Sequence, residues 1–182
     1  MIKSKEIIQI SIFAILLSIC SMISIPLTVP FTFQTFGVFV TCLLIGGKKA
    51  TLSIIVWILL GLVGLPVFSS FKSGFVALLG PTGGYIFGFI ISSLCMWLFQ
   101  NIFPKKITWM IFSMLVALLI CYIIGTSWFI IIYTKTGDNI TISKAISICI
   151  VPFIIFDLIK IMLALIIGNN KFIKSIANNI SI

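Results

Sequence analysis

The sequence has no histidine and only three acidic residues, Glu6, Asp138 and Asp157. Asp157 is the only acid inside an apolar segment, so neither a Ser-His-Asp site nor a pair of catalytic carboxylates can be assembled. The five cysteines are scattered, without a metal-ligand spacing such as C-x-x-C. The chain also lacks the G-x-x-x-x-G-K-[ST] motif of a P-loop. We therefore expect no enzyme activity, no metal site and no cofactor.

Arginine is absent as well, and the twelve basic residues are lysines that stand singly or in pairs. The formal charge of +9 could indicate nucleic-acid binding, but no arginine fork is present to read phosphates, so we expect no nucleic-acid partner. If apolar spans alternate across a membrane, the lysines divide unequally between its sides. One side holds Lys3, Lys5, Lys48, Lys49, Lys105, Lys106, Lys171 and Lys174, and the other holds Lys72, Lys135 and Lys144. The positive-inside rule then places both termini in the cytoplasm.

Charged side chains of either sign are rare: 8% of residues are charged and 61% are hydrophobic. Soluble domains have about 25% charged and roughly 45–50% apolar residues. A helix needs about 20 apolar residues to cross the hydrocarbon layer of a bilayer. Stretches at least that long contain no charge at all: 7–47, 50–71, 73–104 and 107–134. The composition therefore predicts an integral protein of the lipid bilayer.

The prolines divide the apolar sequence into segments, because proline removes a backbone donor and tends to end a helix. We predict an all-α integral membrane protein, a single polytopic membrane domain over residues 1–182 with six transmembrane helices. The predicted spans are about 6–25, 34–46, 50–65, 82–102, 107–134 and 152–168.

The second span is too short for a full crossing, because 13 residues of helix rise only about 20 Å against a hydrocarbon core of roughly 30 Å. The preceding segment 26–33 is apolar but broken by two prolines. Irregular backbone at membrane depth is tolerated only where it is buried in protein or lines a cavity. We expect this segment and the Ser- and Gly-containing stretch 66–80 to form the walls and lid of an outward-facing pocket.

Asp157 and Lys160 are three residues apart in the last predicted span, so they share a helix face and can reach one another. Each costs about 2.5–3.5 kcal/mol at the centre of a membrane helix, which argues against leaving either one unpaired. Two interpretations remain open. The pair is either a structural salt bridge between helices or part of a binding site for a polar or anionic solute.

Further polar residues lie at the starts of two predicted spans. Gln34 and Thr35 open the second span, and Thr82 and Tyr85 open the fourth. A helix N-terminus, a phenol and a primary amide can all hold a polar ligand, although a buried glutamine is often only a helix-end partner. Gly84 and Gly88 form a G-x-x-x-G motif, which is typical of close helix packing.

Four stretches, in order along the chain, carry a resemblance to a known family: 29–37 (VPFTFQTFG), 61–68 (GLVGLPVF), 79–88 (LGPTGGYIFG) and 152–160 (PFIIFDLIK). Together they resemble the BioY family, the biotin-binding S components of energy-coupling factor (ECF) transporters. The resemblance implies a six-helix protein of a bacterial cell membrane that captures biotin from outside. It also implies delivery through a transmembrane coupling subunit driven by two cytoplasmic ATPase subunits. Where family members often have Pro-Gly before the aspartate, this chain has Ile155 and Phe156.

The candidate residues suit biotin, which has a carboxylate, a ureido ring and an apolar thioether ring. Lys160 can meet the carboxylate, Asp157 can accept from a donor, and Phe33 and Tyr85 can cover the apolar part, while Gln34 can pair with a cyclic urea. Which polar group meets which end of the ligand stays open, since Asp157 and Lys160 can also pair with each other. An S component for another vitamin, or a structural membrane protein, are the alternatives.

Small side chains recur along one face of the first span, at Ser11, Ala14, Ser18 and Ser21. Such a stripe lets another helix approach closely, either one of this chain's own spans or a partner's. The family resemblance favours a partner, because S components have a small-x-x-x-small pair on the first helix that meets the coupling subunit. Ala14 and Ser18 stand where that pair would be, so we expect this face to be the docking site.

Overall fold

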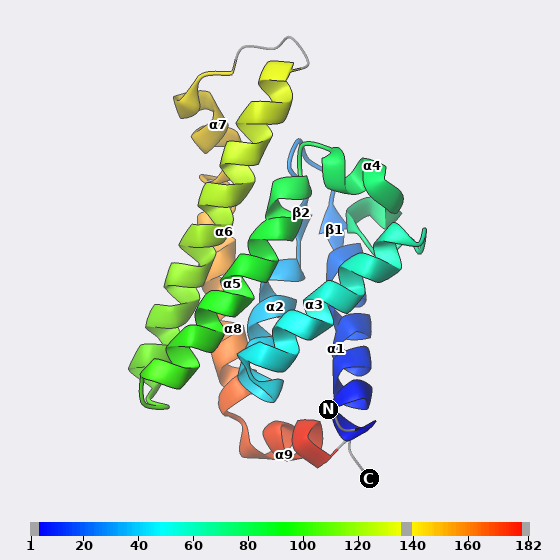
Figure 1. Ribbon diagram of the computed structural model, residues 1–182. Helices are drawn as coiled ribbons and strands as arrows, with labels where there is room; N and C mark the ends of the chain where they lie inside the picture. The colour runs from blue at the N-terminus through cyan, green and yellow to red at the C-terminus, as the bar shows by residue number, and fades with distance from the viewer. Residues whose placement is uncertain (1–3, 136–139, 180–182) are drawn as a thin grey trace.

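The computed structural model describes residues 4–135 and 140–179, and α-helices make up most of this part of the chain (Figure 1). The longer helices are α1 (Ser4–Met22), α2 (Gln34–Ile45), α3 (Gly47–Leu62), α5 (Gly83–Ile102), α6 (Ile107–Lys135) and α8 (Ile154–Asn169). The shorter ones are the 3-10 turn η1 (Ser69–Phe71), α4 (Gly74–Leu79), α7 (Ile142–Cys149) and α9 (Lys171–Asn179). An antiparallel hairpin of β1 (Ser24–Ile25) and β2 (Phe31–Thr32) joins α1 to α2.

Each predicted span coincides with one of the longer helices, but not all of these helices can cross a bilayer alone. By length and composition α1, α5 and α6 can do so, and α7 with α8 forms a fourth candidate that is bent by 43°. As expected, α2 is too short, with 12 residues. The all-α membrane fold is therefore confirmed, whereas six crossings and cytoplasmic termini remain predictions.

Helix α2 ends one residue earlier than predicted, and α3 begins three residues earlier than predicted. The chain reverses at Gly46, whose φ of +82° is a conformation that favours glycine. Gly47 then packs so closely on α5 that an added Cβ would lie 2.5 Å from the Cα of Trp97. Gln100 bridges the break, accepting from the Gly47 N–H at 2.7 Å and donating to the Cys42 carbonyl at 3.0 Å. Its amide thus satisfies backbone groups that the interrupted helix leaves free.

The α5–α6 hairpin confirms the packing role predicted for Gly84 and Gly88. A Cβ added at Gly84 would lie 2.2 Å from the Cβ of Trp128, and one at Gly88 would lie 3.2 Å from the Sγ of Cys121. Any side chain at Gly84 would therefore push the two helices apart. This close approach also brings Tyr85 against Gly125 of α6.

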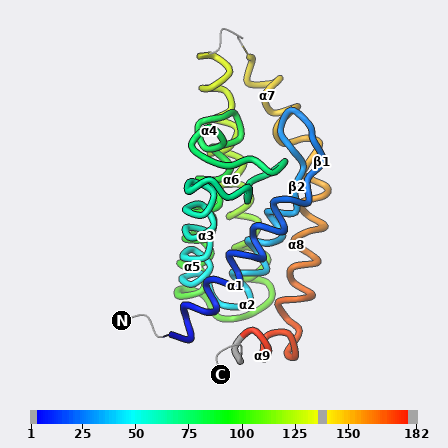
Figure 2. Tube along the Cα trace, turned by 90° about the vertical axis from the view of Figure 1, so that its right-hand side faces the viewer, coloured from blue at the N-terminus to red at the C-terminus, as the bar shows by residue number. Residues whose placement is uncertain are grey.

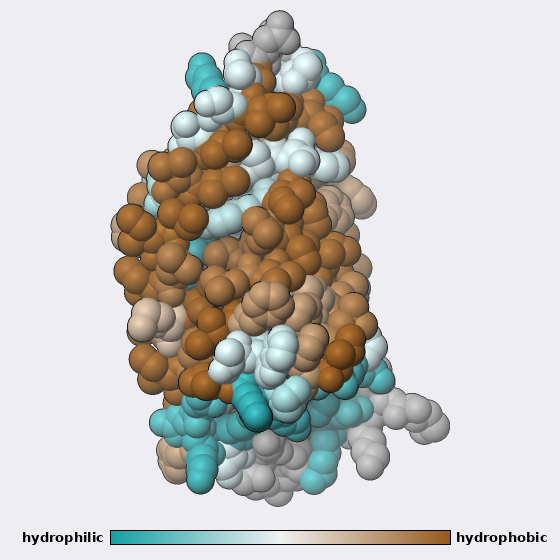
Figure 3. Space-filling model, turned by 90° about the vertical axis from the view of Figure 1, so that its left-hand side faces the viewer, coloured by the Kyte–Doolittle hydropathy of each residue, from teal (hydrophilic) through white to brown (hydrophobic). Residues whose placement is uncertain are grey.

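The two ends of the molecule differ in charge. The start of α1, the α2–α3 turn, the α5–α6 link and α9 lie together at one end, and the hairpin tip, α4 and α7 lie toward the other (Figures 1 and 2). The first group of segments holds Lys5, Lys48, Lys49, Lys105, Lys106, Lys171 and Lys174. Figure 3 shows a hydrophobic belt above a hydrophilic layer at this lysine-rich end. Among the described residues, the fold thus separates the lysines outside α8 into the two sets expected from the sequence, while Lys3 lies outside the described residues.

Candidate functional site

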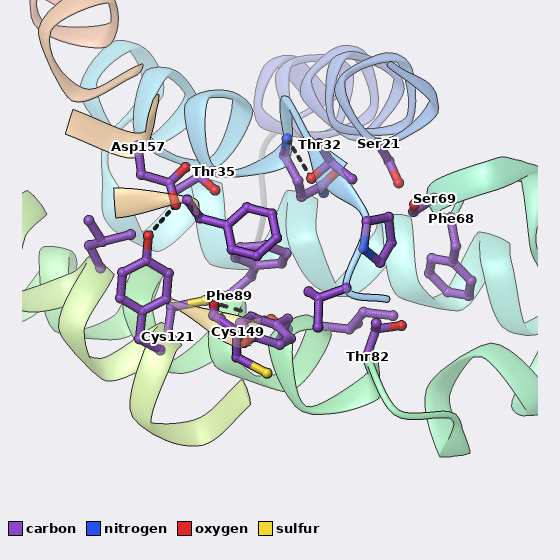
Figure 4. A pocket seen from close by; sticks show the side chains of 18 of the residues that line it. Ser21, Thr32, Thr35, Phe68, Ser69, Thr82, Phe89, Cys121, Cys149 and Asp157 are labelled. Atoms are coloured by element: carbon purple, nitrogen blue, oxygen red, sulfur yellow. Dashed lines mark hydrogen bonds between the residues drawn. The ribbon is translucent and has the colours of Figure 1, made fainter. Parts of the chain in front are cut away.

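A cavity of about 100 Å³ lies where the hairpin, the η1–α4 segment and the ends of several helices meet. The predicted residues Gln34, Thr35, Thr82, Tyr85, Asp157 and Lys160 all line it. In Figure 4, Asp157 and Cys121 lie at one end of the cavity, and Phe68, Ser69 and Thr82 lie at the other. Val29 and Pro30 of the hairpin and Lys72 after η1 also line it. Both irregular segments therefore form walls of this pocket, as expected.

Asp157 and Lys160 form a buried ion pair in the cavity wall. The Lys160 Nζ lies 2.7 Å from the Asp157 Oδ1, and both residues are only 4% exposed. The Nζ also donates to the Thr32 carbonyl at 2.7 Å and lies 4.1 Å from the ring centroid of Phe31. Phe33 is more distant, with 6.0 Å between its ring centroid and the Nζ. The hairpin thus adds a carbonyl acceptor and an aromatic ring to the contacts of this ammonium group.

Tyr122 of α6 completes this arrangement, and the sequence analysis did not identify it. Its hydroxyl donates to the Asp157 Oδ2 at 2.5 Å, so each oxygen of the carboxylate has its own donor. Tyr122, Gly125 and Thr126 share one face of α6 in an otherwise apolar run. This interruption of the apolar pattern is the sequence feature from which Tyr122 could have been identified.

The substitution Tyr122→Phe is expected to weaken ligand binding by about tenfold or more, because hydrogen bonds to charged groups contribute about 1.5–3 kcal/mol. It removes one donor from Asp157 and leaves the packing of the ring in place. Binding measured on the purified protein tests this, with Tyr133→Phe on the same helix as the control. Equal affinity in the parent and Tyr122→Phe would show that Tyr122 does not position Asp157.

Gln34 is 2% exposed, and neither its Nε2 nor its Oε1 has a hydrogen-bond partner among the described residues. The Ser69 Oγ, which also lies on the cavity wall, is in the same state. A buried amide without partners is unfavourable by about 1–3 kcal/mol or more, so such groups are rare in folded proteins. A solute that offers both donors and acceptors would satisfy Gln34.

The remaining wall is largely apolar and aromatic, with Trp57, Phe68, Phe89 and Phe153 among its residues. Trp57 donates from Nε1 to the Val67 carbonyl at 2.9 Å and packs edge-on against Phe68, with ring centroids 5.1 Å apart. These contacts fix the η1–α4 segment over the cavity. The Tyr85 hydroxyl donates to the Cys149 carbonyl at 3.3 Å and ties α5 to α7. The site therefore suits a compact solute with polar ends and an apolar middle.

The stripe of small residues predicted for partner docking was expected to be exposed, but most of it is buried. Ala14, Ser18 and Ser21 are 1%, 7% and 2% exposed, and Ser11 alone of the four is exposed. The small side chains face α2 and α3 of the same chain, and Ser21 lines the cavity. Intramolecular packing thus uses the space beside these three residues, and docking of a partner on this face of α1 stays a prediction that the structure of the single chain does not test. Tryptophan at Ala14 and Ser18 would disrupt the fold itself.

Comparisons with known proteins agree with this architecture. The family model for the BioY family matches residues 1–176. The biotin transporter BioY of Thermotoga maritima is 40% identical over 165 residues, covering 90% of this chain and 94% of that protein. The probable biotin transporter BioY of Pyrococcus horikoshii is 35% identical over 167 residues, covering 91% and 95%. A crystal structure of the S-component for biotin from an ECF-type ABC transporter has a TM-score of 0.79 at 22% identity, covering 92% and 93%. The chain belongs to the BioY family.

Proposed function

We propose that this membrane protein binds biotin in the cavity beside Asp157 and Lys160 and is the substrate-capture subunit of an ECF-type uptake transporter. Its family is one of transporters rather than enzymes. The observation that carries the proposal is the unpartnered amide of Gln34 in the same cavity wall as a buried ion pair. Both features call for a ligand with several donors and acceptors.

The ureido ring of biotin fits the end of the cavity that holds the ion pair. Asp157 would accept from a ureido N–H, and Lys160 would donate to the ureido carbonyl. The biotin carboxylate placed there would put two anions, itself and Asp157, beside the single cation Lys160 in a site shielded from water. The ureido ring is uncharged, so it adds no net charge beside the ion pair. The biotin carboxylate then lies toward Lys72, an exposed cation on the cavity wall. This orientation keeps the charged end of the ligand near water.

Binding of radiolabelled biotin to the purified protein in detergent tests the proposal. We expect saturable binding that unlabelled biotin displaces and that other vitamins, such as riboflavin and thiamine, do not displace. Displacement by another vitamin alone would change the substrate. Absence of saturable binding for all of them would favour a structural role for the ion pair.

We further propose that a transmembrane coupling subunit and two cytoplasmic ATPase subunits drive uptake, in a bacterial plasma membrane. The absence of a P-loop from the sequence supports this, because the chain needs another source of energy. Co-purification with these subunits and ATP-dependent biotin uptake in vesicles would test the assembly. Full ATP-dependent uptake by this chain alone would contradict it.

The proposed orientation places the lysine-rich end in the cytoplasm. In a cysteine-free background, Lys72→Cys is expected to react with a membrane-impermeant thiol reagent in intact cells, and Lys106→Cys only after the membrane is permeabilised. Both side chains are exposed, so reactivity reports the side of the membrane. Labelling of Lys106→Cys alone in intact cells would invert the topology.

A further inference from the structure

A second cavity, of about 350 Å³, lies at the lysine-rich end between the last turn of α2, the α5–α6 link and α9. It shares no lining residue with the proposed biotin cavity. The belt above this end is hydrophobic and the layer around it is hydrophilic, as Figure 3 shows. In the proposed orientation, this end of the molecule lies where the hydrocarbon of the bilayer gives way to headgroups.

Two lysines give this cavity a net positive charge. Lys105 and Lys174 line it, from the α5–α6 link and from α9, and both are exposed. Among residues 4–135 and 140–179 the salt bridges are Glu6–Lys49 and Asp157–Lys160, so no described acidic side chain neutralises either lysine. The polar neighbours that line the cavity include Gln100, whose amide is already paired with backbone groups. The cavity thus presents two unneutralised cations.

The rest of the cavity is apolar and aromatic. Phe103 stacks on Trp109 with ring centroids 4.1 Å apart and 17° between the ring planes, and Phe99 stacks on Phe103 at 5.2 Å. Leu43 and Met110 extend the apolar wall. Tryptophan is enriched where membrane meets water, because its ring is apolar and its N–H is polar. An occupant must therefore combine an anion with a hydrocarbon portion.

Helix α9 adds an independent sign of contact with a bilayer surface. Phe172 is 73% exposed and Ile176 is 47% exposed, and they lie four residues apart on one face. The carbonyl of Ala177 accepts from the buried Gln9 Nε2 at 2.8 Å, and the Gln9 Oε1 accepts from Lys49 at 2.7 Å. This network holds α9 against α1. A short helix with exposed apolar residues and lysines suits the interface plane of a membrane.

We propose that this second cavity binds an anionic phospholipid, such as phosphatidylglycerol. Lys105 and Lys174 hold the headgroup phosphate, and the upper part of an acyl chain lies against Phe99 and Met110. The zwitterionic headgroup of phosphatidylcholine has the same phosphate but also a quaternary ammonium, so its net charge is zero and the two lysines attract it less strongly than an anionic headgroup. The site is separate from biotin binding, and the lipid would hold α9 to the α5–α6 link.

Native mass spectrometry of the detergent-solubilised protein, titrated with phosphatidylglycerol or phosphatidylcholine, tests the proposal. We expect one phosphatidylglycerol to bind more tightly than phosphatidylcholine. A surface lysine contributes about a fivefold gain in affinity for an anionic membrane, so Lys105→Gln with Lys174→Gln is expected to weaken phosphatidylglycerol binding roughly 30-fold. The matched control, Lys135→Gln with Lys144→Gln at the other end, is expected to leave it unchanged.

Retained biotin binding in the Lys105/Lys174 double variant would establish that the protein is folded. If that variant fails to fold, each single variant takes its place, with an expected loss of about fivefold. Equal affinity for the two lipids, or an unchanged affinity in the Lys105 and Lys174 variants, would overturn the proposal. So would full displacement of the lipid by millimolar inorganic phosphate, which would make the cavity a site for the free anion.

Discussion

The substitution Lys160→Met is expected to reduce biotin affinity by about 30-fold or more, since removing one partner of a buried charge pair at a binding site typically costs about 2–5 kcal/mol. Methionine keeps the length of the side chain and removes its charge. It leaves Asp157 buried, with the Tyr122 hydroxyl as the one remaining side-chain donor to its carboxylate among the described residues. Equilibrium binding of radiolabelled biotin to the purified variant measures the loss, with the exposed Lys144→Met as the control.

Biotin methyl ester distinguishes the two orientations of the ligand. If Lys160 meets the ureido ring, the substitution weakens the ester and the acid by the same factor. If Lys160 meets the carboxylate, the ester is already weak in the parent and changes little. The double variant Asp157→Leu with Lys160→Met removes the pair entirely and is expected to fold but not to bind. Parental biotin uptake by that double variant would make the pair purely structural.

The substitution Gln34→Met is expected to change stability and binding in opposite directions. The thermal stability of the ligand-free protein rises, because the change removes a buried amide whose two polar atoms have no partner among the described residues. The gain expected is about 1–3 kcal/mol. Biotin affinity falls by roughly 10- to 100-fold, because the ligand loses its hydrogen bonds to this amide. Unfolding in detergent and biotin binding are measured on the same preparation.

Gln9→Met is the matched control for this prediction. Gln9 is also buried, but both polar atoms of its amide have a partner, since the Nε2 donates to the Ala177 carbonyl and the Oε1 accepts from Lys49. The same chemical change is therefore expected to lower stability there and to leave biotin affinity unchanged. A loss of stability in Gln34→Met as well would mean that Gln34 has a structural partner, and the argument for a ligand at this amide would fail.

Local features of the sequence were sufficient to predict the six main helices and most candidate residues. Prolines and glycines mark helix ends because they restrict the backbone in any context. A charge inside an apolar run is conspicuous for a similarly local reason, since burying it is costly wherever the helix packs. Asp157 and Lys160 were therefore identifiable, and so was the need for irregular backbone before the short α2.

Contacts between distant segments were decided only by the tertiary structure. Tyr122 reaches Asp157 from another helix, so neither sequence neighbourhood reveals the hydrogen bond. The stripe on α1 has the same pattern whether it meets α3 or a partner, and only packing shows that Ala14 is buried within the chain. Gln34 looks like any residue at a helix start in the sequence, and only the structure shows that its side-chain amide has no hydrogen-bond partner among the described residues. Periodicity determines which residues share a helix face, whereas the relative placement of helices determines what that face meets.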